Sequence, residues 1–143
     1  MITFTVQGSP IPQPRQRHRV VKTKSGKVFA TNYTPAKDPV QSWKSYVRAG
    51  AQQAGAKVLT GPVKLTVAFF LPRPASLMRR QDPDFALLHP GARDIDNLYK
   101  AVADCLIGIC YQDDKQVALL YASKWYHEKD RGPRAEITIE NVA

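Results

Sequence analysis

The sequence predicts a single α/β domain over residues 1–143, in which two α-helices pack on a mixed β-sheet in the order β-(ββ)-α-β-α-β-β. Three observations predict this fold class. Residues 2–8 and 116–126 alternate apolar and polar side chains, as strands with one buried face do. Residues 63–71 carry apolar side chains on one whole face and also Ala68 and Phe70 on the other, which is typical of a central strand. Residues 38–54 and 94–109 carry apolar stripes at helical spacing.

The chain begins with a predicted strand and a predicted hairpin. Ile2, Phe4 and Val6 alternate with polar residues, and Gly8 ends the run. Residues 20–22 and 27–30 flank the turn segment 23–26, which predicts a β-hairpin with a lysine-rich tip. These lysines either contact DNA or are simply solvated, and solvation is the commoner case for lysines in a turn.

The next elements are a helix and, at the far end of the chain, a last strand. Asp38 is the predicted N-cap of the helix, Pro39 lies in its first turn and Gly55 ends it. Lys44 lies outside the predicted apolar stripe, which consists of Val40, Trp43, Val47, Ala51 and Ala54. The last strand, residues 136–140, is polar on one side and is predicted to lie at the edge of the sheet.

Two basic segments are candidates for binding DNA phosphates. Residues 9–19 are stiffened by three prolines and present arginines at alternate positions, namely Arg15, Arg17 and Arg19. An exposed linker with scattered arginines explains that pattern equally well. Residues 72–93 are interpreted as a mobile, DNA-facing basic loop whose candidate contacts are Arg73, Arg79, Arg80, His89 and Arg93. A lone histidine in a loop is more often only solvated.

The overall charge indicates the kind of partner. The chain carries 21 Lys and Arg against 12 Asp and Glu, which gives a net charge of +9. A polyanionic partner is the sharper interpretation, and a solvated basic surface is the other. No apolar run approaches the roughly 18 residues that a membrane-spanning helix needs. Nucleic acid is therefore expected as the partner, with no membrane.

The cysteines and the N-terminus indicate the compartment. Cys105 and Cys110 fit no zinc motif, and Cys105 lies on an apolar helical stripe. The N-terminus alternates like a strand and lacks the apolar segment of a signal peptide. We expect a reducing, cytoplasmic location.

Five of the twelve acidic residues lie between Arg93 and Val117, on an otherwise basic chain. Asp94 and Asp96 alternate across one residue, so an extended segment would point both carboxylates the same way. Asp114 follows the helix and would join them if the next strand folds back beside the helix start. Three carboxylates at one point repel each other unless a cation lies between them. Hard oxygen ligands suit Mg²⁺, with Mn²⁺ as a substitute.

Helix capping is the competing interpretation of these aspartates. An acidic residue at a helix N-terminus is favourable by about 0.3–1 kcal/mol, and paired aspartates are ordinary in turns. Two aspartates at the helix start, Lys100 one turn further on, and the pair Asp113 and Asp114 together favour a metal site.

The pattern D-I-D-N-L-x-K at residues 94–100, followed by D-D-x-Q-V at residues 113–117, resembles the RusA-type Holliday junction resolvases, a family of crossover junction endodeoxyribonucleases. The N-terminal pattern G-x-P-x-P-x-x-R-x-R at residues 8–17 resembles the start of that family, and the resemblance covers nearly the whole chain. Arg93 departs from the pattern, because many members have proline there. By resemblance, the metal-binding carboxylates are Asp94, Asp96 and Asp114, and the essential lysine is Lys100.

The resemblance implies an Mg²⁺-dependent hydrolase that cuts four-way DNA junctions in recombination and repair. Asn97, Asp104 and Asp113 are candidates for supporting the metal ligands. A four-way junction has near two-fold symmetry and needs two cuts, so a homodimer is expected. Two alternatives stay open: a non-catalytic nucleic-acid-binding module whose aspartates are caps, and a nuclease for other branched DNA such as flaps or forks.

Overall fold

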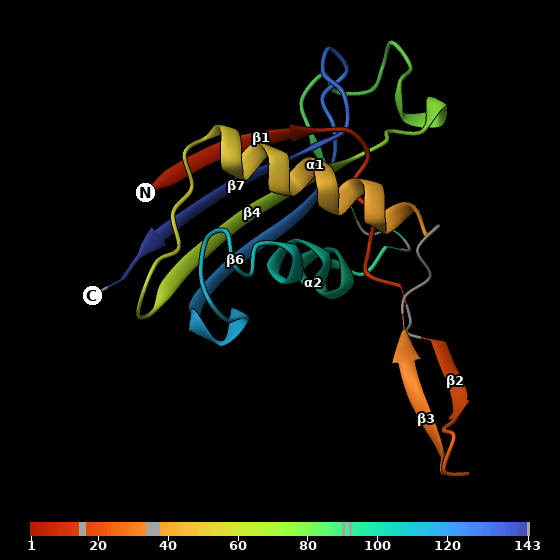
Figure 1. The fold of residues 1–143 in the computed structure, drawn as a ribbon. Coiled ribbons are helices and arrows are strands. Elements are labelled where there is room, and N and C mark those ends of the chain that lie inside the picture. Colours follow the sequence, from red (N-terminus) through yellow and green to blue (C-terminus); the bar gives the residue numbers. More distant parts are fainter. Residues whose placement is uncertain (15–16, 34–37, 90, 92, 143) are drawn as a thin grey trace.

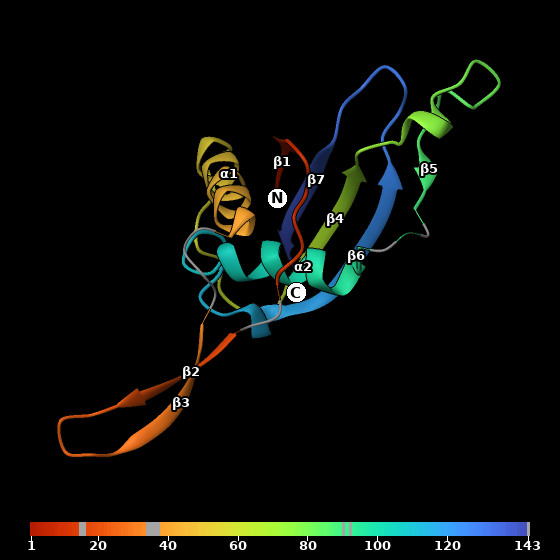
Figure 2. The same ribbon diagram turned by 90° about the vertical axis from the view of Figure 1, so that its right-hand side faces the viewer.

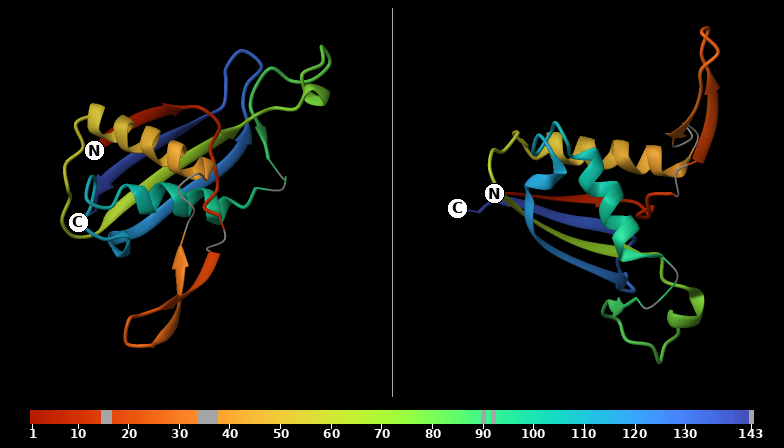
Figure 3. Two further views of the ribbon diagram at one scale, coloured as in Figure 1. Left: turned by 45° about the vertical axis from the view of Figure 1, so that its right-hand side comes forward. Right: turned by 90° about the horizontal axis from the view of Figure 1, so that it is seen from below.

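A computed structural model describes residues 1–14, 17–33, 38–89, 91 and 93–142. Among them, five strands form a mixed sheet in the order β1-β7-β4-β6-β5 (Figure 1). These strands are β1 (Ile2–Gln7), β4 (Val63–Leu71), β5 (Leu87–Leu88), β6 (Val117–Tyr126) and β7 (Arg134–Asn141). The helices α1 (Pro39–Gln53) and α2 (Ile95–Cys105) lie on the same face of the sheet, as the view from below in Figure 3 shows. The predicted fold class is confirmed.

The centre of the sheet is β4, as its apolar sequence predicted. It pairs with β7 in the antiparallel sense and with β6 in the parallel sense, and the chain returns from β4 to β6 through α2. Its side chains facing the helices, including Leu65, Val67 and Phe69, are completely buried.

The prediction that the last strand lies at an edge is wrong. β7 runs between β1 and β4 and pairs with both. Ile137 and Ile139 are buried under the helices, whereas Glu136 and Thr138 are partly exposed on the other face. The alternation of polar and apolar residues in β7 arises because one face of the sheet is not covered by helices. An interior strand shows the same alternation as an edge strand.

Helix α1 begins as predicted, because Asp38 accepts a hydrogen bond from the backbone N–H of Val40 at 3.0 Å. Gly55 adopts a positive φ of 81° just after the helix. One prediction fails here. Lys44, expected outside the apolar stripe, is only 6% exposed and pairs with Asp104 of α2 at 3.2 Å. The reason is that α2 packs beside α1 and covers the aliphatic part of the Lys44 side chain, while the Asp104 carboxylate of α2 pairs with its ammonium.

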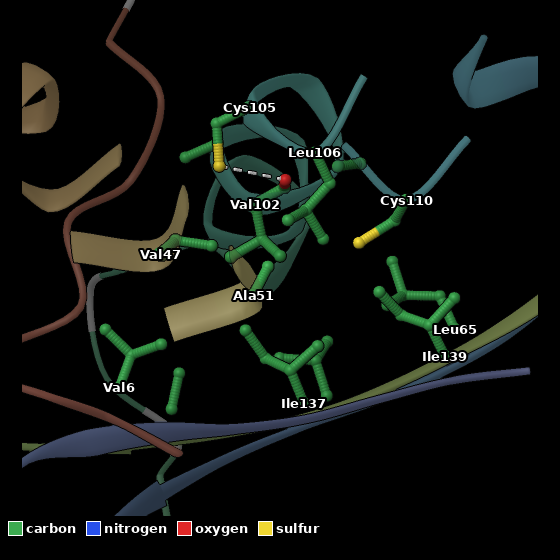
Figure 4. Close-up of a cluster of buried hydrophobic side chains, with 14 of the residues drawn as sticks. Val6, Val47, Ala51, Leu65, Val102, Cys105, Leu106, Cys110, Ile137 and Ile139 are labelled. Atoms are coloured by element: carbon green, nitrogen blue, oxygen red, sulfur yellow. Dashed lines mark hydrogen bonds between the residues drawn. The ribbon is translucent and has the colours of Figure 1, made fainter. Parts of the chain in front are cut away.

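Helix α2 buries the predicted stripe against the sheet and α1. Val102, Cys105 and Leu106 pack there with residues of α1, β4 and β7, and Figure 4 shows this cluster. Both cysteines are free and buried, and burial raises the pKa of the Cys105 thiol to about 12. The thiols therefore stay protonated and are part of the core.

The predicted hairpin is present as β2 (Arg17–Lys22) and β3 (Val28–Tyr33), with longer strands than expected. It stands away from the sheet and the helices (Figures 1 and 2). Within the residues that the structure describes, no helix is both long and apolar enough to cross a bilayer.

Candidate active site

A pocket of about 260 Å³ lies between α2 and the short 3₁₀ turn η2 (Asp114–Gln116) that leads into β6. Its lining comes from three parts of the chain and consists of Gln13, Tyr99, Lys100, Ala103, Asp104 and Asp114. The N-terminal segment is held against the helix because the backbone N–H of Gln13 donates to the carbonyl of Asn97 at 2.8 Å. The pocket therefore joins the two motifs that the sequence singled out.

The two aspartates at the start of α2 are exposed. Asp94 is the N-cap residue, yet its side chain makes no capping hydrogen bond, unlike that of Asp38 in α1. Asp96 lies in the first turn and pairs with Lys100 at 3.3 Å, with side chains 68% and 57% exposed. A pair this exposed adds little stability, so neither aspartate is committed to holding the helix.

The aspartate pair after α2 divides into two roles. Asp113 accepts a hydrogen bond from the backbone N–H of Lys115 at 2.9 Å and caps η2, and this bond is the main reason that its pKa is lowered. The pKa of Asp114 is raised, chiefly by sharing a hydrogen bond with Asp113, then by burial and by repulsion from neighbouring carboxylates. Asp113 thus holds the turn, and Asp114 is the member that lines the pocket.

Tyr99 was not predicted as part of the site. Tyr99 lines the same pocket as Asp114. Burial raises the pKa of its hydroxyl, and the charges of Asp114 and Asp96 raise it further. Helical periodicity could have identified Tyr99, because residues three apart are neighbours on a helix and Tyr99 is three residues after Asp96. Gln13 had no such signal, since its place depends on how the N-terminal segment docks.

The three predicted metal ligands do not meet at one point in this structure. Among the described residues, which include Asp94, Asp96 and Asp114, no three His, Cys, Asp or Glu side chains are close enough to hold a metal ion. The charges of Asp114 and Asp96, which lie on two different elements, both raise the pKa of the Tyr99 hydroxyl. Asp94 and Asp96 lie at the start of α2, whereas Asp114 lies in η2, after the helix has ended. A shared metal site is therefore a proposal.

The segment before Asp94 is fixed by a lysine that the sequence did not single out. Lys124 of β6 donates from Nζ to the carbonyls of Arg93 at 2.6 Å and Gly91 at 3.1 Å. The guanidinium of Arg93 donates to the Ser9 hydroxyl at 3.2 Å and the Pro10 carbonyl at 2.8 Å. These bonds tie the start of α2 to the sheet and to the N-terminal segment.

One predicted DNA contact has a different role. Arg73 is 7% exposed, and its guanidinium donates to the backbone carbonyls of Leu77 and Pro83 at 2.7 Å and of Phe85 at 3.1 Å. The planar guanidinium thus joins both sides of the loop at 72–93. The prediction that Arg73 binds DNA is therefore wrong, because its guanidinium is buried and donates to these carbonyls.

The remaining candidates differ in how they are presented. Arg79 and Arg80 are exposed. His89 packs its ring on Tyr126 with centroids 4.2 Å apart, and its Nδ1 accepts from the backbone N–H of Gly91 at 2.8 Å. Burial, then Lys124 and Arg93, lower the pKa of His89, which favours the neutral ring. Arg15 lies outside the described residues, and Arg17 and Arg19 are described only as positions in β2.

Replacing Arg73 by Lys should destabilise the protein by about 1–3 kcal/mol, because an ammonium cannot reach several separate carbonyls and leaves some without a donor. Urea unfolding measures this change. The matched control, Arg80→Lys in the exposed part of the same loop, should stay within about 0.5 kcal/mol of the parent. Equal midpoints for the two variants would contradict the bracing role of Arg73.

Two comparisons with known proteins place the chain in a family. The family model described as "Endodeoxyribonuclease RusA" matches residues 7–140. The chain therefore belongs to the RusA family and is an endodeoxyribonuclease, a hydrolase of DNA phosphodiester bonds; the family is one of Holliday junction resolvases. A relative in Bacillus subtilis (strain 168), "Uncharacterized protein YqaN", is 35% identical over 150 residues, which is 99% of this chain and 97% of that protein.

Proposed function

We propose that this protein is a divalent-metal-dependent endodeoxyribonuclease that resolves four-way DNA junctions in the cytoplasm during recombination and repair, as a homodimer that makes paired cuts. The observation that carries the proposal is the pocket lined by Lys100 and Asp114, with Asp96 paired to Lys100 at 3.3 Å, in a chain of the RusA family. All three come from the two motifs that define the resemblance.

The metal would be held by Asp94, Asp96 and Asp114. Carboxylate oxygens are hard ligands of the kind that Mg²⁺ and Mn²⁺ prefer. The Asp94 side chain makes no capping hydrogen bond, so binding a metal ion would break none. A bound divalent ion supplies an ionised water and offsets charge on the scissile phosphate. The chain's contribution is to present Asp94 and Asp96 at the positive end of α2 and Asp114 from the facing turn.

Lys100 would hold the scissile phosphate. Lys100 lines the pocket, and its ammonium lies 3.3 Å from a carboxylate oxygen of Asp96. A cation fixed beside the reacting phosphate stabilises the charge that grows there in the transition state. Asp104 lines the pocket and pairs with Lys44, whereas Asp113 caps η2, so both would support the site without binding the phosphate.

The DNA would lie along the basic segments around the pocket. Arg79 and Arg80 are exposed on the loop, and the hairpin adds three exposed lysines, Lys22, Lys24 and Lys27. No acidic residue lies between Arg17 and Tyr33, so the whole hairpin carries charge of one sign. A projecting arm of this kind suits phosphate contacts that are independent of base sequence.

Junction binding should weaken steeply with salt, because each neutralised phosphate releases counterions. Replacing Lys22, Lys24 and Lys27 together by Gln should lower the slope of log K against log [salt] by about 0.9 for each phosphate that a lysine no longer neutralises. Fluorescence anisotropy with a labelled junction measures the slope. Lys57→Gln, in the segment between α1 and β4 at the other end of α1, is the control and should leave it unchanged. A slope that the triple variant leaves intact would remove the hairpin from the DNA surface.

A single gel tests the proposed function. The protein is incubated with Mg²⁺ and an end-labelled four-way junction, beside a linear duplex of the same sequence and a panel of flaps and forks. We expect symmetric cuts in the junction only. Cutting of flaps or forks in preference would support a nuclease for other branched DNA, and binding without any cutting would support a non-catalytic module.

A further inference from the structure

Strand β6 has an outer edge that the rest of the described structure does not cover. β4 pairs with β6 from Val117 to Tyr126 on one side. On the other side β5 reaches only Trp125 and Tyr126, and the N–H of His89 bonds to the carbonyl of Lys124. Residues 117–123 therefore present an unpaired backbone edge within the part of the chain that is described.

This free edge is apolar and unprotected. Leu119, Leu120 and Tyr121 are 44%, 41% and 56% exposed, and Ala118 before them is exposed as well. The register shifts by one residue at Ala118, but from Leu119 to Ser123 the strand is regular and holds no charge and no proline. Native proteins normally blunt an edge of this kind with charges, prolines or a covering segment. The edge is therefore built to be covered by another strand.

We propose that the partner is the same edge of a second copy, paired antiparallel so that two five-stranded sheets become one continuous sheet. The proposal rests on the proposed function and names the surface through which the homodimer forms. The two-fold axis would pass beside Leu120 or Tyr121, near the middle of the regular stretch. Pairing of identical antiparallel strands uses up both edges and closes the assembly at two copies.

Charge favours a second copy at this edge over other parts of the surface. The chain has a net charge of +9, so most arrangements of two copies repel. Residues 116–123 are neutral, whereas the segment before them, Asp113-Asp114-Lys115, is net negative and Lys124 after them is positive. Antiparallel pairing sets the acidic end of each strand beside the basic end of the other.

The arrangement also suits the chemistry. Two antiparallel strands in one sheet are related by an axis perpendicular to the sheet, which keeps the same face of both copies on the same side. Both helices lie on one face (Figure 3), so the two pockets beside α2 and η2 would open toward the same side of the dimer. A single four-way junction lying there would meet two active sites, as paired cutting requires.

Light scattering after gel filtration tests the interface without DNA. We expect the parent protein at twice the chain mass and Leu120→Lys at the chain mass, because a charge placed on the edge opposes pairing. Tyr46→Lys, which changes a residue of α1 that is 60% exposed, should remain a dimer. Circular dichroism and urea unfolding check that each variant is folded. A monomeric parent, or a folded Leu120→Lys dimer, overturns the proposal.

Cross-linking gives an independent measurement. The two native cysteines are buried, so a cysteine placed at position 120 or 121 is the exposed thiol under native conditions. Mild oxidation should trap a disulfide-linked dimer of Leu120→Cys or Tyr121→Cys, and Tyr46→Cys should stay monomeric on a non-reducing gel. Absence of linkage at both edge positions contradicts the pairing.

The two proposals fail separately. A parent dimer that Leu120→Lys separates, but that cuts no DNA, would leave the interface standing and reject the proposed nuclease. A parent that cuts junctions while Leu120→Lys stays dimeric would keep the nuclease and reject this interface. If both proposals hold, the monomeric variant cuts one strand and nicked junctions accumulate in place of paired products.

Discussion

Asp94→Asn should bind a four-way junction as tightly as the parent protein and cut it about a thousandfold more slowly, which corresponds to about 4 kcal/mol of lost transition-state stabilisation. An amide has the shape of the carboxylate but not its charge, so it holds a divalent cation poorly. The side chain makes no capping bond, and asparagine is itself a good N-cap residue. The variant should therefore keep the unfolding midpoint of the parent.

Single-turnover cleavage in Mg²⁺ and junction binding in its absence measure the two effects separately. Asp38→Asn is the matched control, because it makes the same change at a helix N-cap that does bond its helix, far along the chain from the pocket. Asp38→Asn should cut at the parent rate. An Asp94→Asn protein that still cleaves in Mg²⁺ would end the role of Asp94 as a metal ligand.

Lys100→Met has the second largest expected effect, a loss of about a hundredfold or more in the cleavage rate. Methionine keeps the unbranched stem of the side chain and removes the cation that faces Asp96 and the pocket. The ion pair with Asp96 is exposed, so its loss should change stability by less than about 1 kcal/mol. The effect should appear in the rate at saturating DNA, since the phosphate charge is greatest in the transition state.

Metal binding separates this role from that of the aspartates. Lys100→Met should take up Mn²⁺ with at least the affinity of the parent, whereas Asp94→Asn should bind it more weakly. Lys64→Met is the control, since Lys64 also pairs with a carboxylate, Glu140, but on β4 away from the pocket. Unchanged turnover in Lys100→Met would reduce Lys100 to a surface ion pair of the helix.

The sequence predicts the elements of this fold well where a single face is buried. The stripe of α2 and the cap of α1 follow from helical spacing and from Asp38 before Pro39, both local features. The prediction for the last strand fails because Glu136 and Thr138 lie on a sheet face that no helix covers. The same alternation occurs in edge strands and in interior strands. Strand order depends on contacts between distant segments, which local pattern does not contain.

The candidate site was predictable in its residue types and less so in its geometry. Asp94, Asp96, Lys100 and Asp114 were named from their pattern, and the structure brings Lys100 and Asp114 to one pocket. How close Asp114 comes to the helix start depends on the turn after α2, which the sequence does not fix. Tyr99, which also lines the pocket, could have been predicted from its helical spacing to Asp96 but was not.

The arginines of the loop at 72–93 show that a basic sequence alone does not predict which side chains face DNA. Arg73 and Arg80 look alike in a proline-rich, basic segment, but one is buried and the other exposed. The difference arises from carbonyls of Leu77, Pro83 and Phe85, which converge only after the loop has folded. A side chain with several donors is as well suited to tie a loop together as to bind DNA.

The convergence of three carboxylates on one cation is tested most directly by a crystal grown with Mn²⁺ and measured at the manganese absorption edge. We predict an anomalous peak at the start of α2, with oxygens of Asp94, Asp96 and Asp114 at about 2.0–2.2 Å, as expected for a small hard cation. Asp114 must then move toward the helix start relative to its present position. A crystal grown in saturating Mn²⁺ that shows no peak there, or that shows Asp114 outside the coordination sphere, would contradict the proposed catalytic centre.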